Sequence, residues 1–430
     1  MPGIARLFAQ GLKGAHMPHD DFELDNCLKC SVCNTACPVY AAYPEYPGPK
    51  HLGPELERLR MEGLDADTGA VEYCLGCHRC DLACPHQVGV SEMIARAKGS
   101  HRKTLVHTVR DWWFARPGLL GELLSILPSV GNFFLKLSPV RLMMEKLMRI
   151  TARRTFPAYT RPYRKSAQQR VGERVLFFPG CFLTYNRPDL LDKVLALLAC
   201  NGIAAEVVES GCCGVPASAN GDLKEAQLRA EKGLAAMATA VDAGIPVLAA
   251  CASCGHQLKT GFGGALAGDN QREAQAKKLA AQTWDLGEFL AARAAEGLLN
   301  TNFHTLDHRV AYHTPCHLNS QGIGRPWVQL LKSIPGVTVD DLNAGCCGMS
   351  GTYGFKEEKY KVSMAIGAGL FERIGELKPQ LVATECATCQ MQIEHGTKLR
   401  AVSPLEILLE AYDGRPLPPA VGPLHGADAP

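Results

Sequence analysis

The sequence lacks the long apolar runs and the charge excess that mark membrane-spanning or nucleic-acid-binding chains. No stretch approaches the roughly 18 uncharged apolar residues of a spanning helix. The 45 lysines and arginines nearly balance the 43 aspartates and glutamates, so the net charge is only +2 and no nucleic-acid partner is expected. Residues 1–10 lack the apolar core and cleavage site of a secretory signal, which favours a reducing, cytoplasmic location.

Motifs for two-electron cofactors are missing as well. No G-x-G-x-x-G follows a predicted strand, and the glycine-rich residues 261–264 depart from that spacing. No P-loop occurs. We therefore expect neither a flavin nor NAD on this chain, and no dehydrogenase activity from the chain alone.

Cysteine is the residue type present in excess. The 19 cysteines among 430 residues are too few for a disulfide-stapled scaffold, in which cysteine exceeds roughly 8–10% of the chain. They are too many for an ordinary cytosolic enzyme unless the thiols bind something. Eight lie in residues 1–100, none in 101–170 and eleven in 171–430. In a reducing compartment this density favours metal or redox sites.

Two motifs in the first hundred residues have the spacing of bacterial iron–sulfur proteins. Residues 27–38 read C-LK-C-SV-C-NTA-CP, and residues 74–85 read C-LG-C-HR-C-DLA-CP. The fourth cysteine of such a run ligates the other cluster in two-cluster ferredoxins. We therefore predict two 4Fe–4S clusters, one held by Cys27, Cys30, Cys33 and Cys84, the other by Cys74, Cys77, Cys80 and Cys37. Structural zinc, which favours paired C-x2-C units, fits this pattern poorly.

The remaining cysteines belong to an internal repeat. Residues 174–181 match 309–316, residues 211–214 match 345–348, and residues 251–254 match 386–389. The three offsets agree to within one residue, so we predict two copies of one unit related by pseudo-twofold symmetry. Short apolar runs before the cysteines suit buried strands, and helical patterns at 190–198, 224–239 and 360–374 lie between them. Alternating strands and helices indicate parallel α/β units with their sites at the strand ends.

These patterns predict an α+β multidomain chain. We expect an α-helical ferredoxin domain over 1–100 with both cluster motifs, and a helical, basic segment over 101–170. Two tandem Cys-Cys-Gly α/β domains follow over 171–300 and 301–415, and a flexible tail over 416–430.

Each Cys-Cys-Gly copy offers five thiols. The first set is Cys181, Cys212, Cys213, Cys251 and Cys254, and the second is Cys316, Cys346, Cys347, Cys386 and Cys389. Soft thiolates select iron–sulfur clusters, and five exceed the ligands that one zinc needs. A redox-active thiol pair, structural zinc and inert buried cysteines are the alternatives. Gly214 and Gly348 would relieve the tight backbone after each pair. Cys200 ends an apolar helical pattern and is predicted to be a core residue.

Histidines make the second copy different from the first. His313 and His317 flank Cys316, where the first copy has Phe178 and Phe182, and His256 follows Cys254. In one interpretation, these histidines allow the second site to exchange protons with a substrate or quinone. Alternatively, these histidines lie on the surface or only support the site.

The segment without cysteine is apolar and then basic. Residues 105–150 carry tryptophan, phenylalanine and leucine in short stretches that Pro117, Pro128 and Pro139 separate. A basic run follows, with only Glu145 and Glu173 opposing it: Lys136, Arg141, Lys146, Arg149, Arg153, Arg154, Arg161, Arg164, Lys165, Arg170 and Arg174. This composition fits an interfacial membrane anchor, and equally a linker packed on the domains or on a partner subunit.

The combination of motifs resembles the heterodisulfide-reductase and glycolate-oxidase iron–sulfur subunit superfamily. The resemblance covers about residues 20–415 and includes residues 43–50, Gly180-Cys181-Phe182, the CCGVP run at 212–216, residues 312–317 and residues 351–356. It implies electron transfer from an FAD-containing dehydrogenase subunit to menaquinone, at the inner face of the cytoplasmic membrane. Glycerol 3-phosphate and glycolate are the candidate dehydrogenase substrates. The resemblance further implies noncubane 4Fe–4S clusters in the two five-cysteine sets, or a heterodisulfide or thiol reductase that uses a Cys-Cys-Gly site.

Overall fold

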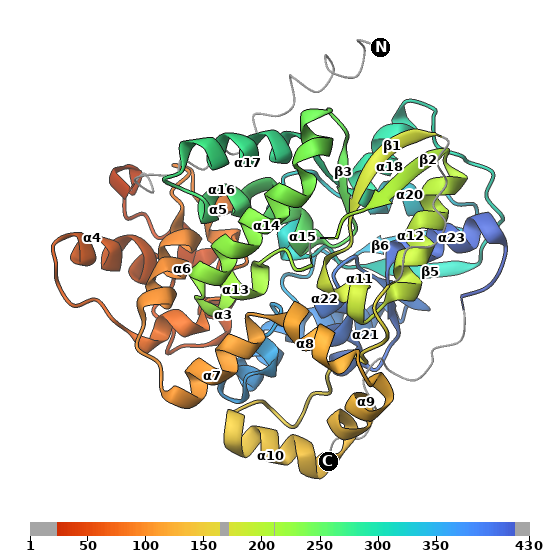
Figure 1. Cartoon of the computed structure of the whole chain (residues 1–430). Coiled ribbons are helices and arrows are strands. Elements are labelled where there is room, and N and C mark those ends of the chain that lie inside the picture. Colours follow the sequence, from red (N-terminus) through yellow and green to blue (C-terminus); the bar gives the residue numbers. More distant parts are fainter. Residues whose placement is uncertain (1–23, 164–171, 210, 418–430) are drawn as a thin grey trace.

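The computed structural model describes residues 24–163, 172–209 and 211–417 (Figure 1). Residues 24–100 form a small helical unit around the two cysteine motifs. Its α-helices are α2 (Val32–Thr35), α3 (Pro38–Ala42), α4 (Leu56–Met61), α5 (Arg79–Ala83) and α6 (Val90–Ser100). The fully buried residues Leu52, Met93 and Ile94 hold it together, and these described residues contain no strand. The expected helical ferredoxin-like domain is confirmed.

Four helices follow in the segment without cysteine. They are α7 (Leu105–Phe114), α8 (Pro117–Leu124), α9 (Pro128–Lys136) and α10 (Ser138–Met148). Proline stands in the first turn of α8, α9 and α10, where its missing N–H costs no hydrogen bond. The prolines thus divide the segment as predicted. Figure 1 shows α9 and α10 projecting from the lower edge of the molecule.

Two four-stranded parallel sheets make up the rest of the chain. The first consists of β1 (Glu173–Phe178), β2 (Ile203–Val207), β3 (Val247–Ala249) and β4 (Thr283–Asp285), in the order β2-β1-β3-β4. The second consists of β5 (His308–Tyr312), β6 (Val337–Asp341), β7 (Leu381–Ala383) and β8 (Ala401–Val402), in the order β6-β5-β7-β8. The identical strand order confirms the repeat and the parallel α/β class.

The predicted strands were those that lead to cysteines: β1, β3, β5 and β7. The sequence patterns did not predict β2, β4, β6 and β8, which complete the two sheets. The helical patterns correspond to α12 (Pro188–Cys200), α14 (Leu223–Asp242) and α21 (Tyr360–Leu377).

One core cluster joins the two copies. It contains Phe177 of β1, Tyr312 of β5 and Leu405 of α23 (Pro404–Asp413), among many others. Helix α18 (Leu286–Ala295) approaches α20 (Pro326–Lys332) so closely that a Cβ at Gly287 would lie 2.5 Å from Trp327 Nε1. Only glycine fits there, and the two copies therefore form one packed body.

The prediction for Cys200 was wrong, because this side chain is exposed at the last residue of α12. The buried face of α12 includes Leu190, Val194, Leu197 and Leu198. Asn201 continues that face and is buried, whereas position 200 is turned away from it.

The basic run is divided between the surface and the interior. Arg141 and Arg154 are buried. Arg149 and Arg153 are exposed. The predictions for Arg164, Lys165, Arg170 and most of the tail at 416–430 fall on residues outside the described part of the chain.

Buried ion pairs connect α7 to residues 356–358 of the second Cys-Cys-Gly copy. Arg110 is 1% exposed, and its guanidinium donates two hydrogen bonds of 2.9 Å to the carboxylate of Glu358. Asp111 accepts from Arg110 and Lys103, and it pairs with Lys356 at 2.9 Å. Burial by itself would raise the pKa of Glu358, but the hydrogen bonds from Arg110 lower it.

We expect Arg110→Met to destabilise the protein by about 3–5 kcal/mol, because it removes both hydrogen bonds to Glu358 and one of the three cations around Asp111. The apparent thermal midpoint should fall by several degrees. Since the pKa of Glu358 is lowered in the folded state, the pair stabilises fully above the unfolded pKa of about 4.3 and is lost as pH falls further. The difference in stability between the variant and the unaltered protein should therefore be smaller in acid than at neutral pH.

Arg174→Met is the matched control. Arg174 is exposed and faces Glu206 at 3.8 Å, so its loss should cost less than about 1 kcal/mol. Equal midpoints for the two variants at neutral pH would show that the Arg110 network contributes no specific stability.

Candidate iron–sulfur sites

The two ferredoxin motifs adopt the same backbone loop. Lys29 and Ser31 in the first motif have φ values of 57° and 69°, and Gly76 and His78 in the second have 63° and 58°. This left-handed backbone is uncommon for residues other than glycine, so a shared constraint is indicated. It wraps the chain tightly between successive cysteines. In the second motif the Gly76 N–H donates to Cys74 Sγ at 3.4 Å.

The structure brings the last cysteine of each motif to the other motif. Burial, followed by the neighbouring sulfurs of Cys27 and Cys84, raises the pKa of Cys33 to about 11. Burial and the nearby Cys74 sulfur likewise raise the pKa of Cys37 to about 11. The first set thus gathers around Cys33, with Cys30 at the exposed surface.

A small cavity marks the second set. Its volume is about 20 Å³, and Cys37, Cys74, Cys77 and Cys80 all line it. The hydroxyl of Tyr46, which also lines this cavity, is buried and has no hydrogen-bond partner among the described residues. Four soft ligands and an unpaired O–H donor fit a 4Fe–4S cluster, whose sulfides accept hydrogen bonds. The sequence patterns did not single out Tyr46, because its role depends on packing.

The second Cys-Cys-Gly set is a compact group of sulfurs. Cys347 Sγ lies 3.3 Å from Cys389 Sγ, and the Gly348 N–H donates to Cys346 Sγ at 3.3 Å. His313 is buried, and one of its ring nitrogens lies within 4.8 Å of the Cys347 and Cys389 sulfurs. Hydrogen bonds from Cys346, Cys389 and His313 lower the pKa of Cys347.

The first Cys-Cys-Gly set has the same organisation. The Gly214 N–H donates to Cys212 Sγ at 3.5 Å. Hydrogen bonds from Cys181 and then Cys213 lower the pKa of Cys212. A hydrogen bond with Cys254 lowers the pKa of Cys251 to about 7. The five thiols of this set therefore form one group of neighbouring side chains.

Both glycines that follow the vicinal pairs have the predicted backbone. Gly214 has φ 96° and Gly348 has φ 86°. A Cβ at Gly348 would lie 2.1 Å from the carbonyl oxygen of Ser363. The expectation that glycine relieves a tight turn is confirmed. Each set has five soft sulfur ligands, whereas a zinc site needs four. The sets therefore fit an iron–sulfur cluster better than zinc.

The second Cys-Cys-Gly set directly adjoins the ferredoxin unit. Cys77 and Cys316 pack in the same hydrophobic cluster, and His317 Nε2 lies 3.0 Å from the carbonyl oxygen of Gly76. Arg79 lies close to Cys316 as well. Cys346 packs within the hydrophobic cluster of the ferredoxin unit. The sulfur sites of the two parts are therefore neighbours rather than separate centres.

Three histidines meet at the junction of the ferredoxin unit and both copies. The ring centroids of His78 and His256 lie 4.4 Å apart, and those of His256 and His317 lie 5.0 Å apart and are stacked. His317 Nδ1 lies 2.8 Å from Ser253 Oγ, so the second copy contacts the first through this ring. His78 was not singled out from the sequence, since nothing local shows that it faces the other two.

Within the described ranges, no single helix has the length and apolar character to cross a bilayer. Helices α8 and α9 have the required length and apolar character only when they are taken together, and they are bent by 110° relative to each other.

Comparison with known proteins identifies two domain families. The sequence matches the 4Fe–4S dicluster domain family over residues 23–88 and the Cysteine-rich domain family over 175–259 and 310–394. One subunit of the anaerobic glycerol-3-phosphate dehydrogenase of Escherichia coli is 38% identical over 401 residues, covering 91% of this chain and 99% of the relative.

More distant relatives share parts of the pattern. The probable glycolate oxidase iron–sulfur subunit of Bacillus subtilis is 25% identical and covers 91% of this chain and 95% of its own length. One subunit of the fumarate reductase (CoM/CoB) of Methanothermobacter marburgensis is 28% identical over 58% of this chain and 48% of its own length. The chain is an iron–sulfur protein of electron transfer, and it belongs to the same family as the E. coli subunit of anaerobic glycerol-3-phosphate dehydrogenase.

Proposed function

We propose that this chain carries electrons from an FAD-containing dehydrogenase subunit, which oxidises glycerol 3-phosphate, to a quinone in the cytoplasmic membrane. The observation that carries the proposal is the packing of Cys77, Cys316 and Cys346 in one hydrophobic cluster, which makes the ferredoxin unit continuous with the second Cys-Cys-Gly set. Iron–sulfur clusters supply one-electron storage at such sites. A chain of adjacent sites suits transfer over a distance better than chemistry at one site.

The ligand sets proposed are those predicted from the spacing. Cys27, Cys30, Cys33 and Cys84 hold one 4Fe–4S cluster, and Cys74, Cys77, Cys80 and Cys37 hold the second. The two five-cysteine sets hold one further cluster each, of noncubane type. Mutual contacts within each set support these assignments.

Electrons enter at the first ferredoxin set. Cys30 is exposed there, and four apolar side chains around the two motifs are exposed as well: Leu28, Val32, Tyr40 and Leu82. Exposed apolar side chains beside a redox site suit a protein partner, and here the partner is the flavoprotein subunit.

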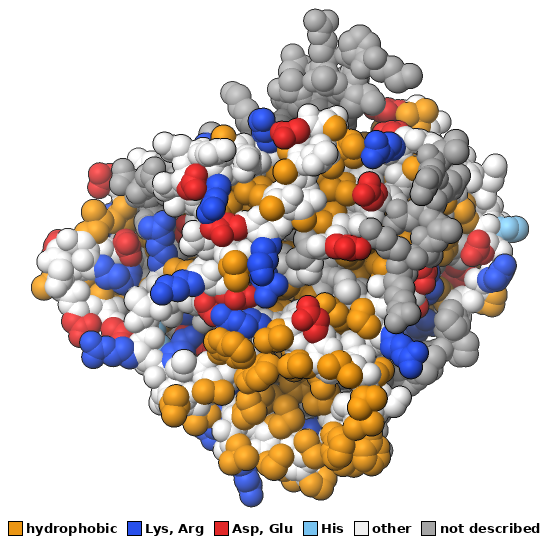
Figure 2. Space-filling view, viewed as in Figure 1, with side chains coloured by type: hydrophobic (Ala, Val, Ile, Leu, Met, Phe, Trp, Pro, Cys, Tyr) orange, Lys and Arg blue, Asp and Glu red, His pale blue; other side chains and the backbone are white. Residues whose placement is uncertain are grey.

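The opposite end of the path faces the membrane. We call the exposed apolar side chains of the segment from α8 to α10 the α8–α10 face, and Figure 2 shows them gathered at the lower edge of the molecule. They are Leu123, Ile126, Leu127, Val130, Phe133, Phe134, Leu142, Met143 and Leu147. Exposed Lys136, Lys146, Arg149 and Arg153 accompany them. Apolar side chains with basic neighbours fit the surface of an anionic bilayer.

The overall reaction balances without a further reactant. Oxidation of the secondary alcohol of glycerol 3-phosphate to a ketone releases two electrons and two protons. The quinone takes up two electrons and two protons to become the quinol. This chain moves only the electrons, so it has no dehydrogenase activity by itself.

The test combines metal analysis with reconstitution. Anaerobically purified protein should contain about sixteen irons and as many labile sulfides, because four clusters of four irons are proposed. With the flavoprotein subunit and quinone-containing liposomes, it should couple oxidation of glycerol 3-phosphate to quinone reduction.

Three other results would each contradict a part of the proposal. About eight irons would leave the Cys-Cys-Gly sets without clusters. Quinone reduction with glycolate but not glycerol 3-phosphate would identify the other dehydrogenase. Turnover of a disulfide substrate that Cys346→Ser or Cys347→Ser abolishes, with no quinone reduction, would identify a thiol reductase.

A further inference from the structure

One large cavity connects the cysteine sets with the segment that lacks cysteine. Its volume is about 1540 Å³, and cysteines of both Cys-Cys-Gly sets line it. At one end the lining is aromatic and apolar, and includes Trp113, Phe114, Leu120, Phe156, Tyr159 and Phe182. Five of these six residues belong to α7, α8 or the stretch after α10, and no cluster ligand set uses them.

This aromatic end touches both Cys-Cys-Gly sets. Phe114 shares a hydrophobic cluster with Cys347, Cys386 and Cys389 of the second set, and Phe156 packs against that cluster. Phe182 directly follows Cys181. Burial, together with the neighbouring Cys181 sulfur, raises the pKa of Tyr159. A Cβ at Gly118 of α8 would be 3.9 Å from Cys212 Cβ, so α8 contacts the vicinal pair itself.

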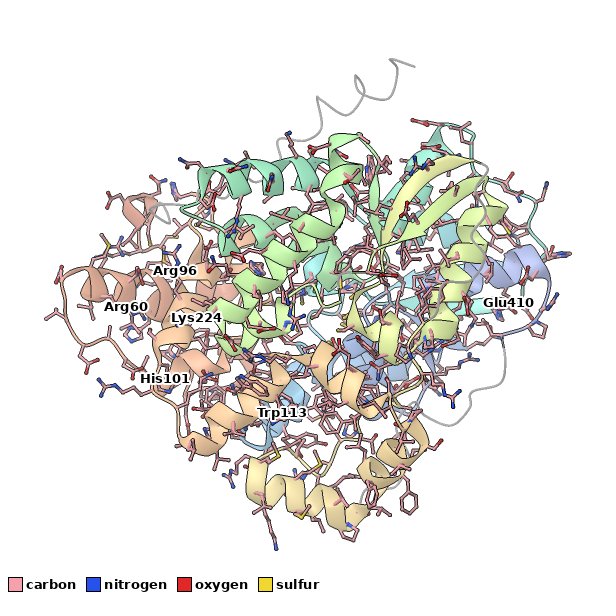
Figure 3. The ribbon with its side chains drawn as sticks, in the orientation of Figure 1. Arg60, Arg96, His101, Trp113, Lys224 and Glu410 are labelled. Carbon is pink, nitrogen blue, oxygen red and sulfur yellow. The ribbon has the colours of Figure 1, made fainter. Side chains whose placement is uncertain are left out.

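The same end adjoins the α8–α10 face. Trp113, Leu120 and Phe156 are only half-buried although they line the cavity, whereas Phe114 is fully buried. The end of α7 and the start of α8 therefore border both the cavity and the surface, where Trp112 is exposed next to Trp113. Further along, α8 leads into exposed Leu123 and Ile126. Figure 3 labels Trp113 near the end of α7, above α10.

The two Cys-Cys-Gly sets are therefore not equivalent in position. The second set adjoins the ferredoxin unit through Cys77 and Cys316. The first set adjoins the aromatic end through Gly118 and Cys212. Electrons that enter through the ferredoxin unit therefore reach the second set where Cys77 and Cys316 pack together.

We infer that the aromatic end of this cavity binds the ring of the membrane quinone, which enters from the bilayer between α7 and α8. The inference rests on the proposed function and names the place at which its acceptor binds. A quinone has a flat ring that stacks on aromatic side chains, and carbonyl oxygens that accept hydrogen bonds. Tyr159 supplies a hydroxyl donor in the lining. Pockets for such ligands are mostly apolar with few polar groups.

The first experiment maps the site directly. The full chain with its clusters is bound to liposomes that contain an azido-naphthoquinone with an isoprenoid tail, then illuminated and digested. The label is expected on the peptides that contain Trp113, Leu120 or Tyr159. Mapping needs no variant, so a folding defect cannot obscure its result.

The second experiment measures affinity with menadione, a naphthoquinone ring without the tail, through quenching of tryptophan fluorescence. Trp113→Leu and Leu120→Trp should each raise the dissociation constant about tenfold, since an aromatic contact is lost or the entrance is narrowed. Trp112→Leu is the matched control. Trp112 is exposed, does not line the cavity and stacks under Arg116 at 4.5 Å, so the affinity should not change.

The outcomes separate this inference from the proposed function. Labelling elsewhere, or equal affinity in the three variants, while quinone reduction persists, overturns the site and leaves the function standing. If the quinone neither binds nor accepts electrons from protein whose clusters have been reduced, the proposed function fails and the site fails with it.

Discussion

Replacing Cys37 by serine is expected to remove the cluster assigned to Cys74, Cys77 and Cys80, although Cys37 belongs to the other sequence motif. The expectation follows from the cavity that these four cysteines line together. Iron should fall by about four atoms per chain, because each cubane cluster contains four. Transfer from the flavoprotein to quinone should be lost, since this cluster lies between the surface set and Cys316.

Double variants identify which cluster is affected. Adding Cys77→Ser to Cys37→Ser should cost no further iron, because both residues serve one cluster. Adding Cys30→Ser should remove about four more, because it serves the other. Cys200→Ser, at an exposed cysteine outside all four sets, should leave the iron content unchanged. The crossed assignment is refuted if Cys30→Ser adds nothing and Cys77→Ser adds a second loss.

A second large effect is expected on membrane binding. In the triple variant Ile126→Ser, Phe133→Ser, Phe134→Ser, the α8–α10 face loses side chains that are 72%, 60% and 52% exposed. Each large apolar side chain contributes about 1.5–3 kcal/mol when it leaves water. The three together correspond to roughly 5 kcal/mol, or more than a thousandfold in partitioning. Cosedimentation with anionic liposomes measures the effect.

The control for membrane binding lies on the ferredoxin unit. Met61→Ser with Leu64→Ser removes two exposed apolar side chains outside the α8–α10 face. This variant should sediment with liposomes like the unaltered protein. High salt should weaken binding only in part, because it screens the basic residues but not the apolar contacts. Unchanged sedimentation of the triple variant would make this face a contact for a protein instead.

Much of the cysteine chemistry was predictable because its determinants are local. Cysteines such as Cys74, Cys77 and Cys80 lie within one short loop, so their spacing alone restricts how the chain can wrap. The glycines after the vicinal pairs, Gly214 and Gly348, are also local determinants. The repeat predicted two equal units because the same apolar runs precede the same cysteines.

Other features could not be predicted, because packing between distant segments decides them. The strand β8 has only two residues, too few for a periodic pattern. Cys200 follows an apolar run, yet its angular position on α12 leaves it exposed. Arg110 and Glu358 are 248 residues apart in the sequence, and only the fold makes them an ion pair.

The sequence by itself therefore determined the class of the protein: two ferredoxin-type motifs, two Cys-Cys-Gly copies, and a separate apolar and basic segment. These properties follow from residue spacing and composition, which need no tertiary contacts. The tertiary structure alone decided what lies beside each cysteine set. It placed Cys316 beside Cys77 and Gly118 beside Cys212, so the two equivalent copies acquire different neighbours. The physical reason is that repeated sequences repeat their internal contacts, whereas their external contacts depend on what packs against each copy.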